Sequence, residues 1–231
     1  MYKRQHLERA AEIDVELFGD RHPKLATVWH NLALVAPSAD EAEALLRKSL
    51  ALHEEVFGRT STVVADDLAN LGIFLHDGGK YEEAEQVLLE SLEIQRERYG
   101  GDHRNIAHVL QYLAELLNDT GQRQRAKDYA EESLAMRQRI LPEDHIDIAR
   151  GHQLIGAIAL NEGRYDDARV SYQRSLELRR RSLRPDDPKL AGPYYGLAQV
   201  ELQDHKPEAA VKACRTALAL EEGAYGPDHP R

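Results

Sequence analysis

Histidines recur at regular points of this chain, and imidazole side chains at fixed spacing could hold a metal ion. The chain has 11 histidines in 231 residues, and four stand at equivalent points: His22, His103, His145 and His229. The other two positions of this series hold Ser61 and Asp187. A proline directly follows His22, Asp187 and His229, as Pro23, Pro188 and Pro230. Ser, Asp and a following Pro are typical of a helix start. We therefore predict that this position caps helices, and we predict no metal site.

Four serines recur in the same way and could suggest nucleophilic catalysis: Ser49, Ser91, Ser133 and Ser175. A nucleophilic serine needs an adjacent base, and no arrangement of His and Asp accompanies this series. A packing role explains the serines better. The sequence also has no glycine loop of the kind that cradles phosphate and no closely spaced metal ligands. We expect no enzymatic activity and no cofactor.

The single cysteine and a run of arginines could be reactive or binding groups, but a structural role explains each of them better. Cys214 is the single cysteine, which excludes an intramolecular disulfide, and we expect its thiol to be buried and inert. A basic run could bind nucleic acid: Arg179, Arg180, Arg181 and Arg184. It lies among acidic residues at the end of a predicted helix, where cations oppose the negative end of the helix dipole. We therefore predict a solvated helix end.

The composition indicates a soluble helical protein that acts in the cytoplasm. The net charge of -10 opposes binding to nucleic acid or to an anionic membrane, and it mildly favours a basic partner. We find no apolar run long enough to span a membrane, and the polar first residues do not resemble a signal peptide. Aromatic residues make up only 6% of the chain, which suits helix packing through small residues.

The sequence repeats every 42 residues. Alanine recurs at this interval at Ala65, Ala107, Ala149 and Ala191, and leucine recurs at Leu92, Leu134, Leu176 and Leu218. A fixed period of 20 to 50 residues is typical of a solenoid, in which each unit buries its apolar face against its neighbours. The question of function therefore moves from an active site to a surface.

Each repeat is predicted to form two helices. Residues 103–117 carry apolar side chains at the spacing of an amphipathic helix, and residues 118–121 interrupt the pattern. A second helix is expected from 123 to 141, with Pro142 ending it. The short turn forces an antiparallel hairpin, and stacked hairpins form an α-solenoid. The predicted fold class is therefore all-α.

The helix pairs resemble a known family. The first helix of each pair, here called helix A, carries a large residue, then Leu or Ile, then Gly or Ala, as in Leu68, Leu71 and Gly72. The second, helix B, follows with Gly, Tyr and Ala, as in Gly163, Tyr165 and Ala168. This pattern resembles the tetratricopeptide repeat, and the 42-residue period is similar to the repeats of kinesin light chains. The resemblance covers essentially the whole chain and implies a superhelix of hairpins.

Small residues and two irregular repeats give local expectations. Gly72, Gly156, Ala84 and Ala168 should lie where two helices cross closely. The first repeat is three residues short, and its second helix should begin near Ser38 as N-cap. The fifth has His205 and Pro207 in place of Gly and Tyr, so proline should occupy the first turn.

The repeats set the predicted boundaries within one continuous solenoid domain. We expect helix B of a preceding partial repeat at 1–21, repeats at 22–60, 61–102, 103–144, 145–186 and 187–228, and the start of a further repeat at 229–231. Solenoids normally end in polar capping elements, and none follows the last repeat. We therefore expect the chain to be a piece of a longer protein. Its uncapped ends could also support self-association.

The resemblance implies that helix A side chains line a concave, peptide-binding groove. Carried over by position, the candidate residues are Asn31, Asn70, His76, His108, Gln111, Tyr112, Glu115, Arg150, Gln153, Tyr195 and Gln199. Asn31 and Asn70 match an Asn of the light-chain pattern, whose amide can pair with a peptide backbone. Some members of the family clamp the carboxylates of a peptide C-terminus with a cluster of cations. At the corresponding surface of this chain, Arg150 is essentially the only cation, so such a clamp is not expected. A neutral or mildly basic peptide or protein is therefore the expected partner.

Three functional hypotheses follow from the sequence. The leading hypothesis is a protein interaction scaffold that binds a peptide or partner protein in the groove. The alternative is a regulatory or sensing arm of a larger signalling NTPase or protease, which the missing cap suggests. A third hypothesis is end-to-end self-assembly. The groove residues could also be merely solvated polar positions on a spacer.

Overall fold

The computed structural model describes residues 2–226, and these residues form helices and no strands. They fall into two compact units, Met1–Gly101 and Asp102–Arg231. The first unit contains α1 (Tyr2–Phe18), α2 (Pro23–Ala33), α3 (Ala39–Phe57), α4 (Thr62–Asp77) and α5 (Tyr81–Tyr99). The second contains α6 (Arg104–Asp119), α7 (Arg123–Ile140), α8 (Ile146–Asn161), α9 (Tyr165–Ser182), the 3₁₀ helix η1 (Pro188–Leu190), α10 (Ala191–Gln203) and α11 (Pro207–Tyr225).

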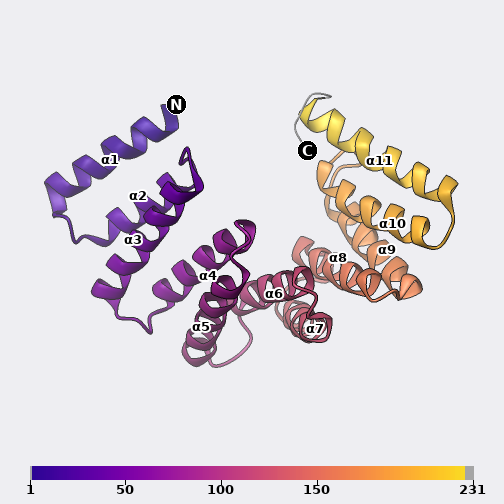
Figure 1. Ribbon diagram of the computed structural model, residues 1–231, viewed down its shortest axis with the longest axis horizontal. Coiled ribbons are helices and arrows are strands. Elements are labelled where there is room, and N and C mark those ends of the chain that lie inside the picture. Colours follow the sequence, from indigo (N-terminus) through magenta and orange to yellow (C-terminus); the bar gives the residue numbers. More distant parts are fainter. Residues whose placement is uncertain (1, 227–231) are drawn as a thin grey trace. The chain divides into compact units, whose positions relative to one another are not determined.

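Within each unit, consecutive helices pair into hairpins that stack on one another (Figure 1). Helix A and helix B of one repeat pack together as α2 with α3, α4 with α5, α6 with α7, α8 with α9, and α10 with α11. Each helix B also packs against the next helix A inside its unit, as α7 does against α8 and α9 against α10. The predicted all-α solenoid of hairpins is therefore confirmed. The prediction of one continuous domain stays a prediction, and residues 229–231 lie outside the described residues.

The recurring histidines cap the A helices. The Nδ1 atoms of His22, His103 and His145 accept hydrogen bonds from the backbone N–H two residues later, at 3.2 to 3.3 Å. Ser61 and Asp187 accept from backbone N–H groups in the same way. These bonds satisfy donors that a helix start otherwise leaves unpaired. The capping prediction is confirmed at these five positions, and His229 lies outside the described residues.

A left-handed residue closes each turn between helix A and helix B in repeats two to five. Gly79, Gly121 and Gly163 have φ of 74° to 76°, and His205 has φ of 57° at the equivalent place. The following N–H bonds the carbonyl five residues earlier, as Arg164 N does to Ala159 O at 2.9 Å. A side chain at positive φ is strained. His205 therefore keeps the turn at a cost that the other repeats avoid with glycine.

The predicted features of the two irregular repeats are confirmed. Ser38 caps α3, and its side chain accepts from the backbone N–H of Glu41 at 3.3 Å. Pro207 is the first residue of α11, where its missing N–H has no helical partner to lose.

Close helix approach explains the small residues. A Cβ at Gly72 would lie 2.6 Å from Leu88 Cγ, and Ala84 and Ala168 are fully buried. Larger side chains at these points would separate the two helices.

Three of the four recurring serines tie helix B to helix A by hydrogen bonds, and the fourth, Ser175, is buried with its hydroxyl unpaired. Ser49, Ser91 and Ser133 each donate to a backbone carbonyl of their own helix A, of Ala26, Ala65 and Ala107 respectively, at 2.6 to 3.0 Å. Their packing role is confirmed.

Cys214 corrects an expectation from the sequence, because its thiol is exposed. The equivalent residues Leu88 and Tyr172 are buried. Tyr172 is covered by helices α8 and α10 on either side, at Gly156 and Gly196. Cys214 lies on α11, and among the described residues no later helix A covers it.

Candidate functional site

The predicted groove residues all lie on A helices, three of them in the first unit and eight in the second. Asn31 is on α2, and Asn70 and His76 are on α4. In the second unit they fall on three successive A helices: His108, Gln111, Tyr112 and Glu115 on α6, Arg150 and Gln153 on α8, and Tyr195 and Gln199 on α10.

Five of the eight residues in the second unit line one pocket of about 490 Å³: Glu115, Arg150, Gln153, Tyr195 and Gln199. They come from α6, α8 and α10, so the 42-residue repeat brings side chains that are far apart in sequence to one surface. We call this space the α8–α10 pocket. Its remaining lining is Leu154, Ala157, Tyr172, Arg179, Gly192 and Gly196.

Glycines on α10 give the α8–α10 pocket its room. A Cβ at Gly192 would lie 2.9 Å from the Gln153 Nε2 atom, and a Cβ at Gly196 would clash with the ring of Tyr172. The residue equivalent to Gly196 in the preceding repeats is Leu154 or Tyr112. The fifth repeat therefore lacks a side chain where its neighbours have a large one.

An ion pair and a ring stack occupy the α6 side of the site. Arg150 Nη2 donates to Glu115 Oε1 at 3.3 Å, and the guanidinium lies 5.5 Å from the centre of the Tyr112 ring. Burial alone lowers the pKa of Arg150, but Glu115 and Tyr112 outweigh it and raise the pKa above its ordinary value. The positive charge of Arg150 is thus largely balanced by a carboxylate at the rim.

His108 is a neutral member of the same cluster at physiological pH. Its ring meets the Tyr112 ring edge-on, with centroids 4.7 Å apart. Part of the residue is open to solvent, but desolvation of the imidazole and the positive charges of Arg150 and Arg137 lower its pKa to about 4. The imidazole can therefore donate and accept hydrogen bonds at pH 7.

Gln111 corrects one of the predicted groove residues. The residue is fully buried, where an exposed side chain was expected. Its Oε1 accepts from Arg137 Nη1, and its Nε2 donates to Glu115 Oε1 at 2.6 Å. Both ends of the Gln111 amide are therefore already bonded, so Gln111 positions Glu115 and does not contact a ligand itself.

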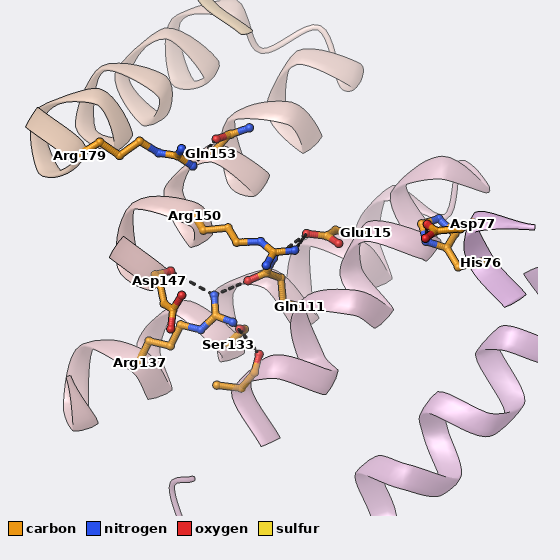
Figure 2. Close-up of polar contacts among 11 residues, drawn as sticks. His76, Asp77, Gln111, Glu115, Ser133, Arg137, Asp147, Arg150, Gln153 and Arg179 are labelled. Atoms are coloured by element: carbon orange, nitrogen blue, oxygen red, sulfur yellow. Dashed lines mark hydrogen bonds and ion pairs between the residues drawn. The ribbon is translucent and has the colours of Figure 1, made fainter. Parts of the chain in front are cut away.

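Buried arginines connect successive repeats, a role that the repeat pattern did not predict. Arg137 on α7 donates to Gln111 of its own repeat and to Asp147 O at the start of α8, the latter at 3.1 Å. One repeat later, Arg179 on α9 donates to Gln153 Oε1 at 2.6 Å and to Lys189 O in η1. Figure 2 shows Arg137 pointing toward Gln111 and Asp147, and Arg179 pointing toward Gln153.

The solvated position predicted for Arg179 is therefore wrong, because the residue is only 9% exposed. Burial lowers the pKa of the Arg137 and Arg179 guanidinium groups. Arginine stays charged, so each needs the bonds it makes. The signal that could have revealed this role is the pairing of Arg137 with Gln111 and its recurrence 42 residues later as Arg179 with Gln153.

The three predicted groove residues of the first unit, Asn31, Asn70 and His76, are half-buried. His76 lies near Asp77, with 4.0 Å between Nδ1 and the nearest carboxylate oxygen, and its ring centre lies 5.8 Å from that of Tyr81.

The described residues give no site for a metal ion and no membrane span. Within residues 2–226 there is no group of three or more His, Cys, Asp or Glu placed to hold a metal. None of the helices in this part of the chain combines the length and apolar content needed to cross a bilayer.

Solved structures with the same fold include kinesin light chain-like proteins. BtubC (BKLC) from P. vanneervenii is 19% identical with a TM-score of 0.78, and the match covers 100% of this chain and 94% of that one. A putative kinesin light chain with nearly identical TPR-like repeats from Podosopora anserina is 18% identical with a TM-score of 0.70, over 88% and 98% of the two chains. No curated protein matches the sequence at a significant level.

A family model described as tetratricopeptide repeat matches residues 65–139 and 147–222. A second model with the same description matches residues 38–62. Together with the 42-residue hairpins, these matches show that the chain belongs to the tetratricopeptide repeat family, and its fold is similar to that of the kinesin light chain-like structures.

Proposed function

We propose that this protein is an interaction scaffold that binds a peptide segment of a partner protein along the A helices of its second unit. The tetratricopeptide fold is a protein interaction fold. One observation carries the finer proposal: five side chains assigned to a groove from sequence alone line a single pocket of about 490 Å³.

The chemistry of the surface favours an uncharged or mildly basic peptide. Glu115 balances Arg150, and His108 is neutral at pH 7. Gln199 is exposed on α10, so its amide can both donate to and accept from a peptide backbone. Tyr195 adds a ring whose hydroxyl is fixed by a 2.9 Å hydrogen bond to Glu221 Oε2. A rigid aromatic side chain of this kind loses little entropy when it is covered by a ligand.

The proposal extends to the first unit, where Asn31, Asn70 and His76 lie on A helices. These side chains would contact a further stretch of a partner. A cytoplasmic location, a role as the arm of a larger signalling protein, and self-association stay predictions.

Peptides selected from a random phage library on the immobilised protein test the proposal. We expect Gln199→Ala and Tyr195→Ala each to weaken binding of the selected peptides by about tenfold, because both remove contact area and hydrogen bonding from the lining of the α8–α10 pocket. The matched control is Gln173→Ala, since Gln173 is exposed on α9 and lies outside the α8–α10 pocket. Affinity is measured by fluorescence anisotropy with labelled peptides, and circular dichroism checks that each variant stays folded.

Two outcomes would contradict the proposal. One is a library that yields no peptide binding the native protein more tightly than an unrelated sequence. The other is a set of peptides whose affinity is the same for native protein, Gln199→Ala and Tyr195→Ala.

A further inference from the structure

Tyr172 enters the α8–α10 pocket from α9, the helix behind it. The residue is 3% exposed and still lines the pocket. Its ring lies between two glycines: a Cβ at Gly156 would lie 3.2 Å from ring atoms Cδ1 and Cδ2, and a Cβ at Gly196 would clash with Cζ, which carries the hydroxyl. The ring is therefore held between α8 and α10, and the ring carbon that bears the hydroxyl lies against α10.

The hydroxyl of Tyr172 is an unused hydrogen-bond donor. Among residues 2–226 it makes no hydrogen bond, and it is not one of the fully buried unpaired atoms, which are Gln95 Oε1, Ser175 Oγ and Arg179 Nε. The oxygen therefore reaches solvent through the pocket. Burial raises the pKa of Tyr172 to about 12, so the hydroxyl keeps its proton at physiological pH. A protonated, nearly buried hydroxyl without a partner is costly unless something else completes its bonding.

A second donor lines the same pocket, on Gln153. Gln153 accepts from Arg179 with its Oε1 atom at 2.6 Å, which fixes the orientation of the amide. Its Nε2 atom then points toward α10, where a Cβ at Gly192 would lie 2.9 Å away. This amide nitrogen makes no hydrogen bond within the described part of the chain. Two free donors at one pocket call for an oxygen acceptor from outside.

We propose that the α8–α10 pocket is a subsite that receives an uncharged carbonyl oxygen of the bound peptide, with the Tyr172 hydroxyl and the Gln153 amide as donors. The inference rests on the proposed function and specifies which atoms of the partner this site takes. The carbonyl belongs either to an Asn or Gln side chain of the peptide or to its main chain.

The charges at the pocket favour a neutral acceptor over a carboxylate. Glu115 holds Arg150 at the α6 rim, and Glu221 accepts from Tyr195 at the α10 rim. Arg179 spends its Nη donors on Gln153 and on Lys189 O. A carboxylate entering the pocket would therefore meet two nearby carboxylates, an Arg150 that already pairs with Glu115, and an Arg179 whose Nη donors are occupied by uncharged oxygens.

The subsite is confined to one place in the array. The residues equivalent to Tyr172 are Leu88, Ala130 and Cys214, which have no hydroxyl. A peptide lying along the A helices is thus recognised by this hydrogen bond at a single position, which would fix its register.

The Tyr172→Phe variant tests the subsite because it keeps the ring between the two glycines and removes only the hydroxyl. We expect it to weaken binding of the phage-selected peptides by about 5- to 10-fold, since a buried acceptor loses its donor. The midpoint temperature of its thermal unfolding should not fall, because the hydroxyl makes no hydrogen bond within residues 2–226 of the free protein. The control is Tyr129→Phe on α7, outside the pocket, which should leave peptide affinity unchanged.

Peptide variants identify the acceptor and complete the test. An alanine scan of one selected peptide is measured against native protein and Tyr172→Phe. If one Asn or Gln position loses affinity on native protein but not on Tyr172→Phe, the side-chain amide is the acceptor. If Tyr172→Phe weakens every scanned peptide equally, the acceptor is a main-chain carbonyl.

Three results would overturn the subsite. The first is equal affinity of the selected peptides for native protein and Tyr172→Phe, and the second is coupling of Tyr172 to an Asp, a Glu or the terminal carboxylate of the peptide. The third is a loss of stability in Tyr172→Phe. If the peptides still depend on Gln199 and Tyr195 in the first case, the proposed function stands and only the subsite is wrong.

Discussion

At the scale of single residues, the bonds that a side chain already makes decide whether it is available to a partner. Gln111 has both ends of its amide bonded, whereas the Tyr172 hydroxyl makes no hydrogen bond among residues 2–226. The caps at His103 and His145 were predictable because Ser61 and Asp187 occupy the same point, and all four can accept from a helix N–H. The full burial of Gln111 was not predictable, because the equivalent Gln153 and Tyr195 are only half-buried. The Gln111 amide is held by the side chain of Arg137, 26 positions later. Tyr172 was likewise missed, since its ring reaches the pocket only where glycines on two other helices leave room.

His205→Gly should stabilise the protein. The residue holds φ of 57° at a turn where the equivalent residues are glycines, so the substitution removes strain that outweighs the added freedom of the unfolded chain. The expected gain is about 0.5 to 1 kcal/mol in the free energy of unfolding, measured by urea denaturation. Gly163→Ala, at the equivalent turn of the fourth repeat, should shift stability in the opposite direction. A fall in stability for His205→Gly would show that the His205 side chain, and not its backbone, matters.

At the scale of helices, the repeats are joined by buried polar bonds as well as by apolar contacts. The 42-residue pattern predicted which helices pair, because apolar spacing and turn residues are local signals. It did not predict the arginine that crosses from one repeat to the next. Arg137 lies on the inward side of α7 and reaches a backbone carbonyl of α8. Such a contact depends on how two helices approach each other and leaves no periodic apolar signal.

Arg137→Met should destabilise the second unit. The change keeps apolar bulk but leaves Gln111 Oε1 and Asp147 O without this donor, so we expect a loss of about 2 to 3 kcal/mol. The matched control is Arg139→Met on the same helix, where the side chain is 55% exposed and pairs with Asp102. That exposed pair is screened by solvent, so its loss should cost much less stability than the loss of the buried Arg137 bonds. Urea denaturation of both variants decides the point, and equal losses would refute a special role for Arg137.

At the scale of the whole molecule, the repeat period is sufficient to predict the fold class. Within each unit, a hairpin packs only against its sequence neighbours, so local patterns carry most of the fold. The division into two compact units was not visible, because the repeat continues through Gly101 and Asp102 without a change in pattern. The candidate surface was predicted more coarsely than the fold, since resemblance gives positions on a helix but not which side chains are already bonded.

The most direct measurement of the central claim is NMR mapping of a bound, phage-selected peptide on the isotopically labelled full chain. The account predicts that the backbone and side-chain signals of Gln153, Tyr195 and Gln199 shift together and saturate with one affinity, because these residues line a single pocket. Shifts confined to the exposed faces of α7, α9 or α11, with these three residues unchanged, would contradict it.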